Sequence, residues 1–389
     1  MRLAAMSAYA PRDVWGNDKI AARLRLERRK VDAELRRDRG EGLSEDEAKL
    51  FTTSDRWVKR FIGFEERRFC NDGEGTIDLA VRAARKLLET NDHSPSDIDW
   101  IIFGSVTSSY LYSPPDAALL QHELGIPVFE GGRPREIKGA DVSLACTTWV
   151  SSLMISYALI RSGMAKNVLL IGADRMSAAL NWRERAFATV LGDAGTATLC
   201  TAVPESEDWF GTDQFWGWIN GEGAEMIITP VGGSKHPLRS VEDIEKYRHC
   251  ISMNGRGVRE FMVPFLGGPA TDAALEKAGW GMEQLDLASL HEANLVLNEA
   301  IVKQWKDRGF AGEVLNAGGM FGNTTSASIP LTWVLNAGAL SLNKRFGFFG
   351  FGGGMSASIA LGTIRHPITI STEIEGHETV AVTHSGSTT

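Results

Sequence analysis

A pattern of helix, turn and strand that occurs twice is the feature that most limits how this chain can fold. In the first passage, residues 76–89 have the apolar spacing of a helix, and residues 98–103 form a short apolar strand that stops at a glycine. In the second passage, residues 270–278 are helical, and the strand at residues 285–290 stops at His291. We therefore expect two copies of one unit in which helices and strands alternate.

The repeat continues into a second helix and strand. In the first copy a long helix begins near Cys146 and leads to a strand at residues 168–171, and in the second copy a helix begins near Asn323 and leads to a strand at residues 346–351. Superposing the copies sets Cys146 opposite Asn323. The strands are uniformly apolar, which is typical of sheets covered by helices on both faces.

The size of the chain agrees with two core-bearing halves. The chain has 389 residues, 43% hydrophobic and 23% charged, and we place the divide near Pro204, giving halves of residues 1–204 and 205–389. The formal net charge of -8 argues against nucleic acid as the main partner, because phosphate binding requires a cationic surface. No run of about 18 apolar residues predicts a membrane span.

The four cysteines indicate neither a metal site nor a disulfide framework. They are widely scattered and form no CxxC pair or Cys/His cluster with ligand spacing. We therefore predict a protein of the reducing cytoplasm that holds no metal. The cysteines are Cys70, Cys146, Cys200 and Cys250.

Two further segments are expected to lie on the surface. Residues 18–49 are densely charged, with Leu24 and Leu26 among the apolar residues that suggest an amphipathic helix. A solvated helix face is the simpler interpretation, and contact with a carrier protein or another partner is the alternative. Residues 240–249 are interpreted as an inserted helix, and the Trp-rich residues 208–220 as packing residues.

Three residues stand where strands end or helices begin. At a helix start, the helix dipole and free backbone N–H groups favour the thiolate form of Cys146. Alone, each of the three has a simpler interpretation: a core cysteine for Cys146, an exposed or satisfied histidine for His291, and a helix cap for Asn323. The repeat brings all three to the same edge of the layered sheets, which favours a nucleophilic site.

The glycine-rich residues 350–354 do not form a dinucleotide fingerprint, because the GxGxxG spacing is missing. They can instead bring backbone N–H groups close to a substrate carbonyl. Together with the amide of Cys146, they would form an oxyanion hole.

Motifs spread over most of the chain beyond residue 50 resemble those of the β-ketoacyl-acyl carrier protein synthase III family in the thiolase superfamily. They occur in the order of that family. The motifs are TSDRWV at 53–58, DVSLACTTW at 141–149, GDAGTA at 192–197, MNGRGV at 253–258, HEAN at 291–294, GNTTSASIP at 322–330 and GFGGG at 350–354.

This resemblance implies a thiolase-like five-layered αβαβα fold of two duplicated halves, and a two-stage condensation. Cys146 would take the acyl group of an acyl-coenzyme A. His291 and Asn323 would then stabilise the enolate of a decarboxylating malonyl thioester, carried by acyl carrier protein or coenzyme A. The amides of Gly353 and Cys146 would hold the oxyanion. No cofactor would be bound permanently, since coenzyme A thioesters are the substrates.

The resemblance also implies further binding residues and a homodimer. Trp57 and Arg185 would stack on the adenine of coenzyme A, and Asn294 would help to bind it. Tyr112 and Ser113 would lie in the loop that closes the acyl pocket of the partner subunit.

Departures from the family pattern leave an alternative function open. An arginine expected shortly after the HxAN motif is replaced by Val296, and another is displaced to Arg60. The alternative is a ketosynthase III-like acyltransferase or a head-to-head condensing enzyme of a natural-product pathway. A degradative thiolase is excluded, because no second cysteine follows Cys250.

Overall fold

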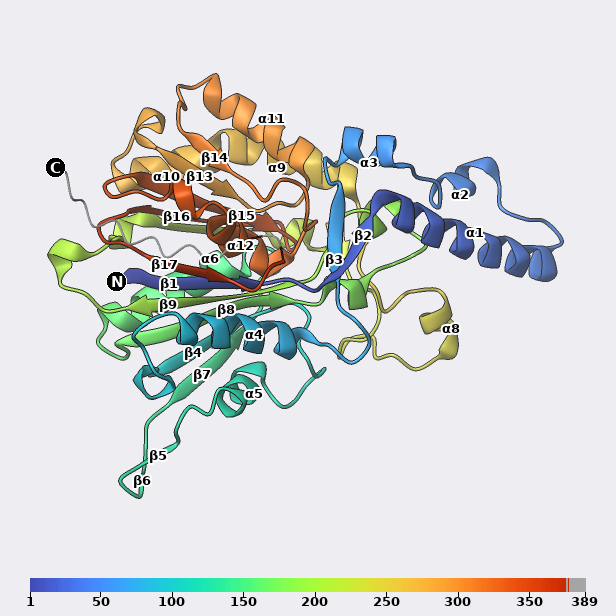
Figure 1. Ribbon diagram of the computed structural model, residues 1–389. Helices are drawn as coiled ribbons and strands as arrows, with labels where there is room; N and C mark the ends of the chain where they lie inside the picture. The colour runs from blue at the N-terminus through green and yellow to red at the C-terminus, as the bar shows by residue number, and fades with distance from the viewer. Residues whose placement is uncertain (376, 378–389) are drawn as a thin grey trace.

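Two stacked β-sheets form the centre of the computed structural model, which describes residues 1–375 and residue 377 (Figure 1). The first sheet has the order β17 (Thr369–Thr372), β1 (Arg2–Tyr9), β9 (Ala194–Thr201), β8 (Asn167–Asp174), β4 (Trp100–Gly104) and β7 (Lys138–Val142). The second has the order β10 (Phe215–Ile219), β16 (Ser356–Thr363), β15 (Arg345–Gly352), β13 (Leu287–Leu290) and β14 (Glu313–Leu315). Three small ribbons pair β2 (Asp13–Gly16) with β3 (Glu66–Phe69), β5 (Phe129–Glu130) with β6 (Arg133–Pro134), and β11 (Ile227–Ile228) with β12 (Ser252–Met253).

The two sheets have the same topology. The order β1, β9, β8, β4, β7 in the first sheet corresponds to β10, β16, β15, β13, β14 in the second, and each pair of neighbours has the same parallel or antiparallel direction. The predicted duplication is therefore confirmed. The predicted divide near Pro204 falls between β9 and β10, while β17 returns from the C-terminal part to pair with β1.

Helices complete five layers. On the outer face of the first sheet lie α4 (Thr76–Glu89) and α5 (Asp116–Glu123). Between the sheets lie α6 (Thr148–Arg161) and α12 (Ser328–Leu335). The outer face of the second sheet is covered by α9 (Gly255–Gly267), α10 (Pro269–Ala278) and α11 (Leu295–Lys306). The remaining helices are α1 (Asn17–Arg39), α2 (Glu45–Lys49), α3 (Asp55–Phe61), α7 (Arg185–Ala188) and α8 (Val241–Glu245).

The predicted helix at residues 76–89 shows how the sequence fixes this architecture. Leu79, Ala83 and Leu87 recur every four residues, and all three are buried against the first sheet. The Asp78 carboxylate accepts a hydrogen bond from the Gly75 amide at 2.7 Å, which satisfies a free donor at the helix start. Apolar spacing and capping therefore agree, and the helix has the predicted bounds.

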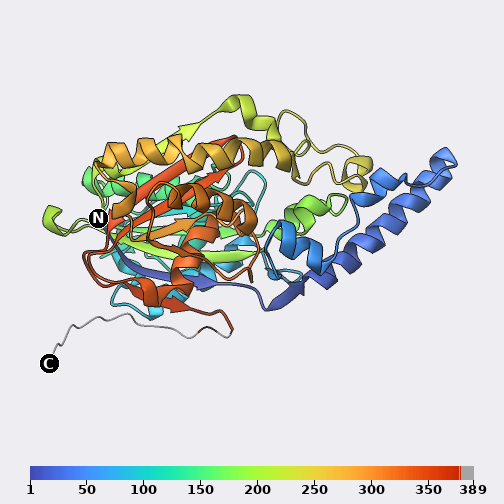
Figure 2. The same ribbon diagram turned by 90° about the horizontal axis from the view of Figure 1, so that it is seen from above.

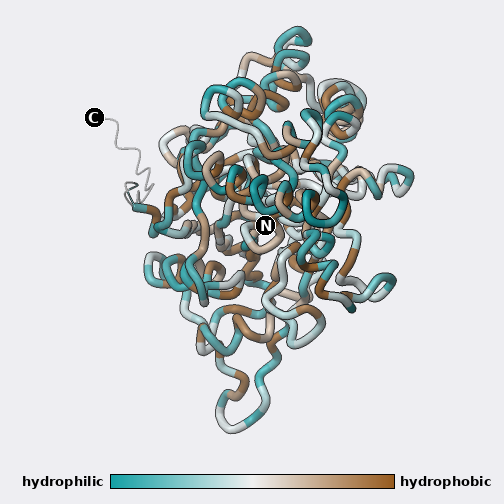
Figure 3. The backbone as a smooth tube through the Cα atoms, turned by 90° about the vertical axis from the view of Figure 1, so that its right-hand side faces the viewer, coloured by the Kyte–Doolittle hydropathy of each residue, from teal (hydrophilic) through white to brown (hydrophobic). Residues whose placement is uncertain are grey.

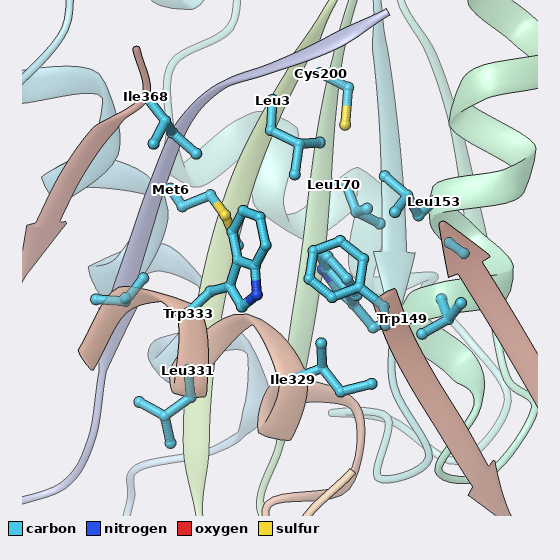
Figure 4. Packing of buried hydrophobic residues seen from close by; sticks show 14 of the residues in the cluster. Leu3, Met6, Trp149, Leu153, Leu170, Cys200, Ile329, Leu331, Trp333 and Ile368 are labelled. Carbon is cyan, nitrogen blue, oxygen red and sulfur yellow. The ribbon is translucent and has the colours of Figure 1, made fainter. Parts of the chain in front are cut away.

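Aromatic side chains fill the space between the sheets (Figure 4). Trp333 of α12 meets Phe348 of β15 with ring centroids 4.6 Å apart, and Trp149 of α6 meets the same phenylalanine edge-on at 5.1 Å. Each ring is almost completely buried, so this layer contributes strongly to stability. Figure 3 shows the apolar segments concentrated in the interior, with hydrophilic residues on many outer loops and helices.

The charged N-terminal segment differs from its prediction. It is not one helix over residues 18–49, because α1 ends at Arg39, where Gly40 adopts a left-handed φ of 79°, and the short α2 follows. Leu24 is buried, but Leu26 is 52% exposed, so its place in the apolar stripe was wrong. Figures 1 and 2 both show α1 projecting from the body of the molecule.

The inserted helix predicted at residues 240–249 is also shorter than expected. Only Val241–Glu245 are helical, because Tyr247 has a positive φ of 54° that ends the helix. Among the Trp-rich residues, Trp209 is almost completely buried and Trp218 packs on Phe265 at 4.4 Å, in agreement with the predicted packing role.

Candidate active site

Cys146 lies in a tightly held turn directly before the central helix α6. The residue before it, Ala145, has a left-handed φ of 46°, and the residue at the matching position of the second half, Gly322, has a φ of 66°. Such a φ is uncommon in alanine and must be held by the surrounding structure. The Thr147 and Thr148 hydroxyls provide part of that support, because they donate to the carbonyl oxygens of Leu144 and Ala145 at 2.7 and 2.6 Å.

The glycine-rich end of β15 packs directly on Cys146. A Cβ atom added at Gly352 would lie 2.6 Å from the Cβ and 3.0 Å from the Sγ of Cys146, so only glycine fits there. The backbone amides of Gly353 and Cys146 lie near enough to the sulfur to lower the pKa of the thiol as hydrogen-bond donors. These are the two amides that the sequence indicated for an oxyanion hole.

The Cys146 thiol is less acidic than the helix-start position suggested. Burial raises its pKa to about 12, and the negative charge of Asp174 acts in the same direction. Hydrogen bonds from the Gly353 and Cys146 amides lower the pKa, but by less. Desolvation therefore outweighs the expected preference for the thiolate, and the thiol form prevails at neutral pH.

Replacing Gly352 with alanine is expected to push Cys146 out of place. The added methyl group would overlap the cysteine side chain, so we expect the rate of Cys146 alkylation or acylation to fall about tenfold or more. The measurement is the rate of mass increase with an acyl-coenzyme A or iodoacetamide.

Gly338→Ala is the matched control, because no atom lies within 4 Å of the added Cβ. Equal rates for the two variants would contradict the tight fit at Gly352.

His291 follows β13 directly and is completely buried. Its backbone N–H donates to the Phe349 carbonyl of β15 at 2.9 Å, and its ring meets Phe351 edge-on at 5.6 Å. Burial lowers the pKa of the imidazole to about 3, so the ring is neutral at physiological pH, with one N–H donor and one acceptor. Neither ring nitrogen has a hydrogen-bond partner in the part of the chain that the structure describes, so both are left for another molecule.

Asn323 lies in the matching turn of the second half and is 7% exposed. Its backbone N–H donates to the Val190 carbonyl at 2.8 Å, and its own carbonyl accepts from the Gly192 amide at 3.0 Å. The side-chain oxygen accepts from the Thr325 amide at 2.9 Å. That bond fixes the carboxamide and turns its NH₂ group away from the Thr325 amide.

The glutamate after His291 ties the histidine to the segment that carries Asn323. The Glu292 backbone N–H donates to the Ser328 hydroxyl at 2.8 Å, and its carboxylate accepts from the Ala317 amide at 2.6 Å. Ala317 and Ser328 flank Asn323 in the sequence. The HEAN strand end and the Asn323 turn are therefore held together.

A second buried carboxylate, Asp174 at the end of β8, connects the same turn with β4. It accepts from the Ser326 backbone N–H at 3.0 Å and from the Thr107 hydroxyl at 2.9 Å, and the Ser326 hydroxyl also binds it. Burial raises its pKa, and these hydrogen bonds oppose the rise. Sequence reasoning missed Asp174 and Glu292, although each is an acidic residue at the end of an apolar strand, a pattern that could have revealed both.

Glu292→Gln is expected to make the protein more stable in a pH-dependent way. Burial raises the pKa of Glu292 to about 7, compared with about 4.3 in an unfolded chain. The folded state therefore binds the proton more tightly, and its stability falls as the pH rises from about 4 to about 7. Glutamine keeps an acceptor for the Ala317 amide and removes this penalty, so we expect a gain of about 4 kcal/mol at pH 8 and about 1 kcal/mol at pH 5.

Urea unfolding at the two pH values measures this effect, and Glu299→Gln on the exposed face of α11 is the control. An equal gain at both pH values would refute the assignment of a raised pKa to Glu292.

Trp57 and Arg185, predicted to hold adenine, lie together. The Arg185 guanidinium carbon is 4.3 Å from the centre of the Trp57 ring, and its Nη1 donates to the Thr52 carbonyl at 2.6 Å. A base inserted between the two groups would need a separation of roughly 7 Å, about two van der Waals contacts. The observed separation is therefore too small to admit a base between them. The pair therefore offers an outer stacking face in this conformation. Asn294 caps α11 through the Leu297 amide and donates to the Phe61 carbonyl, so its side chain connects α11 with α3.

The predicted acyl-pocket loop lies on the surface of the chain. Tyr112 is 74% exposed, and Ser113 next to it is also exposed. Tyr110 and Leu111 are exposed as well, which makes this loop an apolar projection.

The described residues form neither a metal cluster nor a membrane-spanning helix. No group of three His, Cys, Asp or Glu side chains in that part of the chain is arranged to hold a metal ion. None of the described helices combines the length and apolar character that crossing a membrane requires.

The duplicated five-layered fold, with a cysteine at the start of its central helix, defines the class of thiolase-like condensing acyltransferases. Two family models match the chain, 3-oxoacyl-[acyl-carrier-protein] synthase III over residues 140–214 and its C-terminal model over residues 275–364. The first range includes Cys146, and the second includes His291, Asn323 and Gly353.

Individual relatives agree with these models. The β-ketoacyl-[acyl-carrier-protein] synthase III of Fusobacterium nucleatum is 32% identical over 314 residues, covering 80% of this chain and 90% of the relative. That of Aliarcobacter butzleri is 32% identical over 327 residues, covering 81% and 91%. The crystal structure of the Thermus thermophilus synthase III matches with a TM-score of 0.73 and 27% identity, covering 93% of this chain and 99% of that one. The chain belongs to the β-ketoacyl-acyl carrier protein synthase III family.

Proposed function

We propose that this enzyme loads an acyl group from an acyl-coenzyme A onto Cys146 and condenses it with a malonyl thioester. The observation that carries the proposal is the packing of Gly352 on Cys146, which places the Gly353 amide beside the amide of Cys146 itself as backbone donors toward the sulfur. The same donors can hold the oxyanion of a tetrahedral intermediate at that sulfur.

In the first half-reaction, the Cys146 sulfur attacks the thioester carbonyl. The carbon–sulfur bond to coenzyme A breaks, and the thiol proton leaves with coenzyme A as its free thiol. Because the pKa of Cys146 is about 12, this proton is present at neutral pH and its transfer is part of the step.

In the second half-reaction, the bond between C2 and the carboxylate of the malonyl group breaks. Carbon dioxide leaves, and the electron pair remains on C2 as an enolate. We assign the stabilisation of the enolate oxygen to an N–H of His291 and the NH₂ group of Asn323. C2 then attacks the acyl carbonyl, the β-ketoacyl thioester leaves, and the Cys146 thiolate takes up a proton.

The neutral imidazole suits this role. Burial keeps His291 uncharged, so it can donate a hydrogen bond to the enolate without surrendering its proton. Its ring nitrogens, which have no hydrogen-bond partner among the described residues, are the second observation that supports a substrate at this position.

The remaining assignments belong to the same proposal. Trp57, Arg185 and Asn294 would bind coenzyme A, with adenine on the outer face of the Trp57–Arg185 pair. The exposed loop with Tyr112 and Ser113 would enter the acyl pocket of a second subunit in a homodimer. The halves would comprise residues 1–204 and 205–389, and the four free cysteines fit a reducing cytoplasm.

A two-stage mass measurement tests the proposal. The protein is incubated with a panel of acyl-coenzyme A thioesters, and intact mass reports the acyl adduct. Malonyl-coenzyme A or malonyl-acyl carrier protein is then added, and carbon dioxide release is measured. Discharge of the adduct with carbon dioxide release supports condensation, whereas discharge only by an alcohol or amine would replace it with simple acyl transfer.

A further inference from the structure

Helix α1 carries a stripe of exposed arginines. Arg25, Arg28, Arg29, Arg36 and Arg39 fall within an arc of roughly 100° around the helix axis, so they share one side of the helix, and all are exposed. The only acidic residue within this stripe is Asp32, which pairs with Arg36 at 2.8 Å. We call these five residues the arginine stripe.

The charge of the arginine stripe is only partly offset within the chain, since Asp32 interacts with Arg28 and Arg36, and Glu47 with Arg39. Arg25, Arg28, Arg29 and Arg39 form no salt bridge or hydrogen bond with any residue that the structure describes. The rest of the chain is acidic, because nine basic and five acidic residues lie in α1 while the whole chain has a net charge of -8. The positive surface is therefore local.

The other side of α1 is fixed to the body of the enzyme. Ile20 and Leu24 are completely buried. Glu27 is only 3% exposed, and its carboxylate lies 3.3 Å from Arg23 and 3.8 Å from Arg183. Arg183 also binds Glu34 at 3.1 Å. These contacts hold the arginine stripe in a defined position.

The arginine stripe belongs to an arm of the chain whose two ends contact the segments of the predicted coenzyme A residues. Asn17, the first residue of α1, donates to Asp55 at the start of α3 at 2.9 Å, and α3 carries Trp57. The Arg185 backbone N–H donates to the Leu50 carbonyl at 2.9 Å. The N-terminal arm, residues 17–52, therefore borders the Trp57–Arg185 pair.

We propose that the arginine stripe docks an acidic carrier protein that delivers the malonyl group on a flexible thioester arm. This inference rests on the proposed function, and it assigns the malonyl thioester to a protein partner. A docked protein would place its thioester arm beside the Trp57–Arg185 pair, where the pantetheine part of coenzyme A would also enter. The small local stripe on an acidic chain favours a protein of matching size over a long polyanion.

Charge reversal of two stripe residues tests the proposal. The Arg25→Glu/Arg29→Glu variant is compared with the wild type for kcat/KM toward malonyl-acyl carrier protein and toward malonyl-coenzyme A. We expect the value for the carrier protein to fall at least tenfold, mainly through KM, and the value for malonyl-coenzyme A to stay within twofold. The difference should shrink in 0.5 M salt, because screening weakens exposed charge contacts.

Arg133→Glu/Lys166→Glu is the matched control. Both residues are exposed, neither forms a salt bridge within the described chain, and the change in net charge is the same. Circular dichroism and melting temperature verify folding of both variants. An equal loss for both malonyl thioesters, or an equal loss in the control, would overturn the proposal.

Direct binding separates this inference from the proposed function. Binding of acyl carrier protein to the wild type and to Arg25→Glu/Arg29→Glu is measured by calorimetry. If the wild type condenses neither thioester, the proposed function fails, but loss of carrier binding in the variant still supports the surface. Unchanged binding of the carrier protein in the variant would refute docking at the arginine stripe. Docking would also be refuted if the variant lost affinity only for phosphatidylglycerol vesicles or for a DNA duplex.

Discussion

Cys146→Ala is expected to form no acyl adduct with any acyl-coenzyme A and to lose condensation activity by roughly 10⁴-fold or more. Alanine removes the sulfur that receives the acyl group but leaves the Gly353 amide and the fold in place. Adduct formation is read from intact mass, and activity from carbon dioxide release.

Cys200→Ala and Cys70→Ala are the controls for this result. Cys200 is completely buried in β9, and burial raises the pKa of its thiol to about 12, the value found for Cys146. Cys200 therefore matches Cys146 in acidity but lacks the glycine-rich strand end. An acyl adduct that persists in Cys146→Ala, or vanishes in Cys200→Ala with the fold intact, would assign the nucleophile elsewhere.

His291→Ala and Asn323→Ala are expected to separate the two half-reactions. Each should lower decarboxylative condensation by about 10² to 10³-fold, the usual effect of removing a donor to a developing oxyanion. Acylation of Cys146 should change far less, since the Gly353 and Cys146 amides serve that step. The measurement is the single-turnover rate of acylation beside the rate of carbon dioxide release.

The conservative variant Asn323→Asp sharpens this test. It keeps an acceptor for the Thr325 amide at nearly the same shape, but it replaces the NH₂ donor with an oxygen. Condensation should therefore be lost as in Asn323→Ala, and because a buried carboxylate is destabilising, the loss of melting temperature should be smaller at pH 5 than at pH 8. Equal losses of acylation and condensation in these variants would show that His291 and Asn323 maintain the structure of the site and do not act on the malonyl group alone.

Much of the fold could be predicted because the apolar spacing of helices and the apolar runs of strands are local features of the sequence. The apolar spacing of residues 76–89 and the buried strands β8 and β15 gave elements close to the observed ones. The repeat then required two sheets of the same order, which the structure has. Where local signals were weak, the prediction was wrong, as at Leu26 and in the short helix α8.

The electrostatics of the site could not be predicted in this way. The helix start suggested an acidic thiol at Cys146, but burial and the charge of Asp174 raise its pKa. Asp174 lies 28 positions away in the chain, and its hydrogen bonds reach Ser326 in the other half. The contact between Trp57 and Arg185 likewise joins distant segments.

The sequence by itself determined the duplicated architecture and the positions where the three polar residues interrupt apolar strands or precede helices, because periodicity and chain order are properties of short stretches. Only the tertiary structure decided the protonation of Cys146 and His291, the hydrogen bonds by which Glu292 joins two segments, and the contacts between the N-terminal arm and the helix that carries Trp57. These depend on desolvation and on contacts between remote segments, which act through distances in space that the order of residues does not contain.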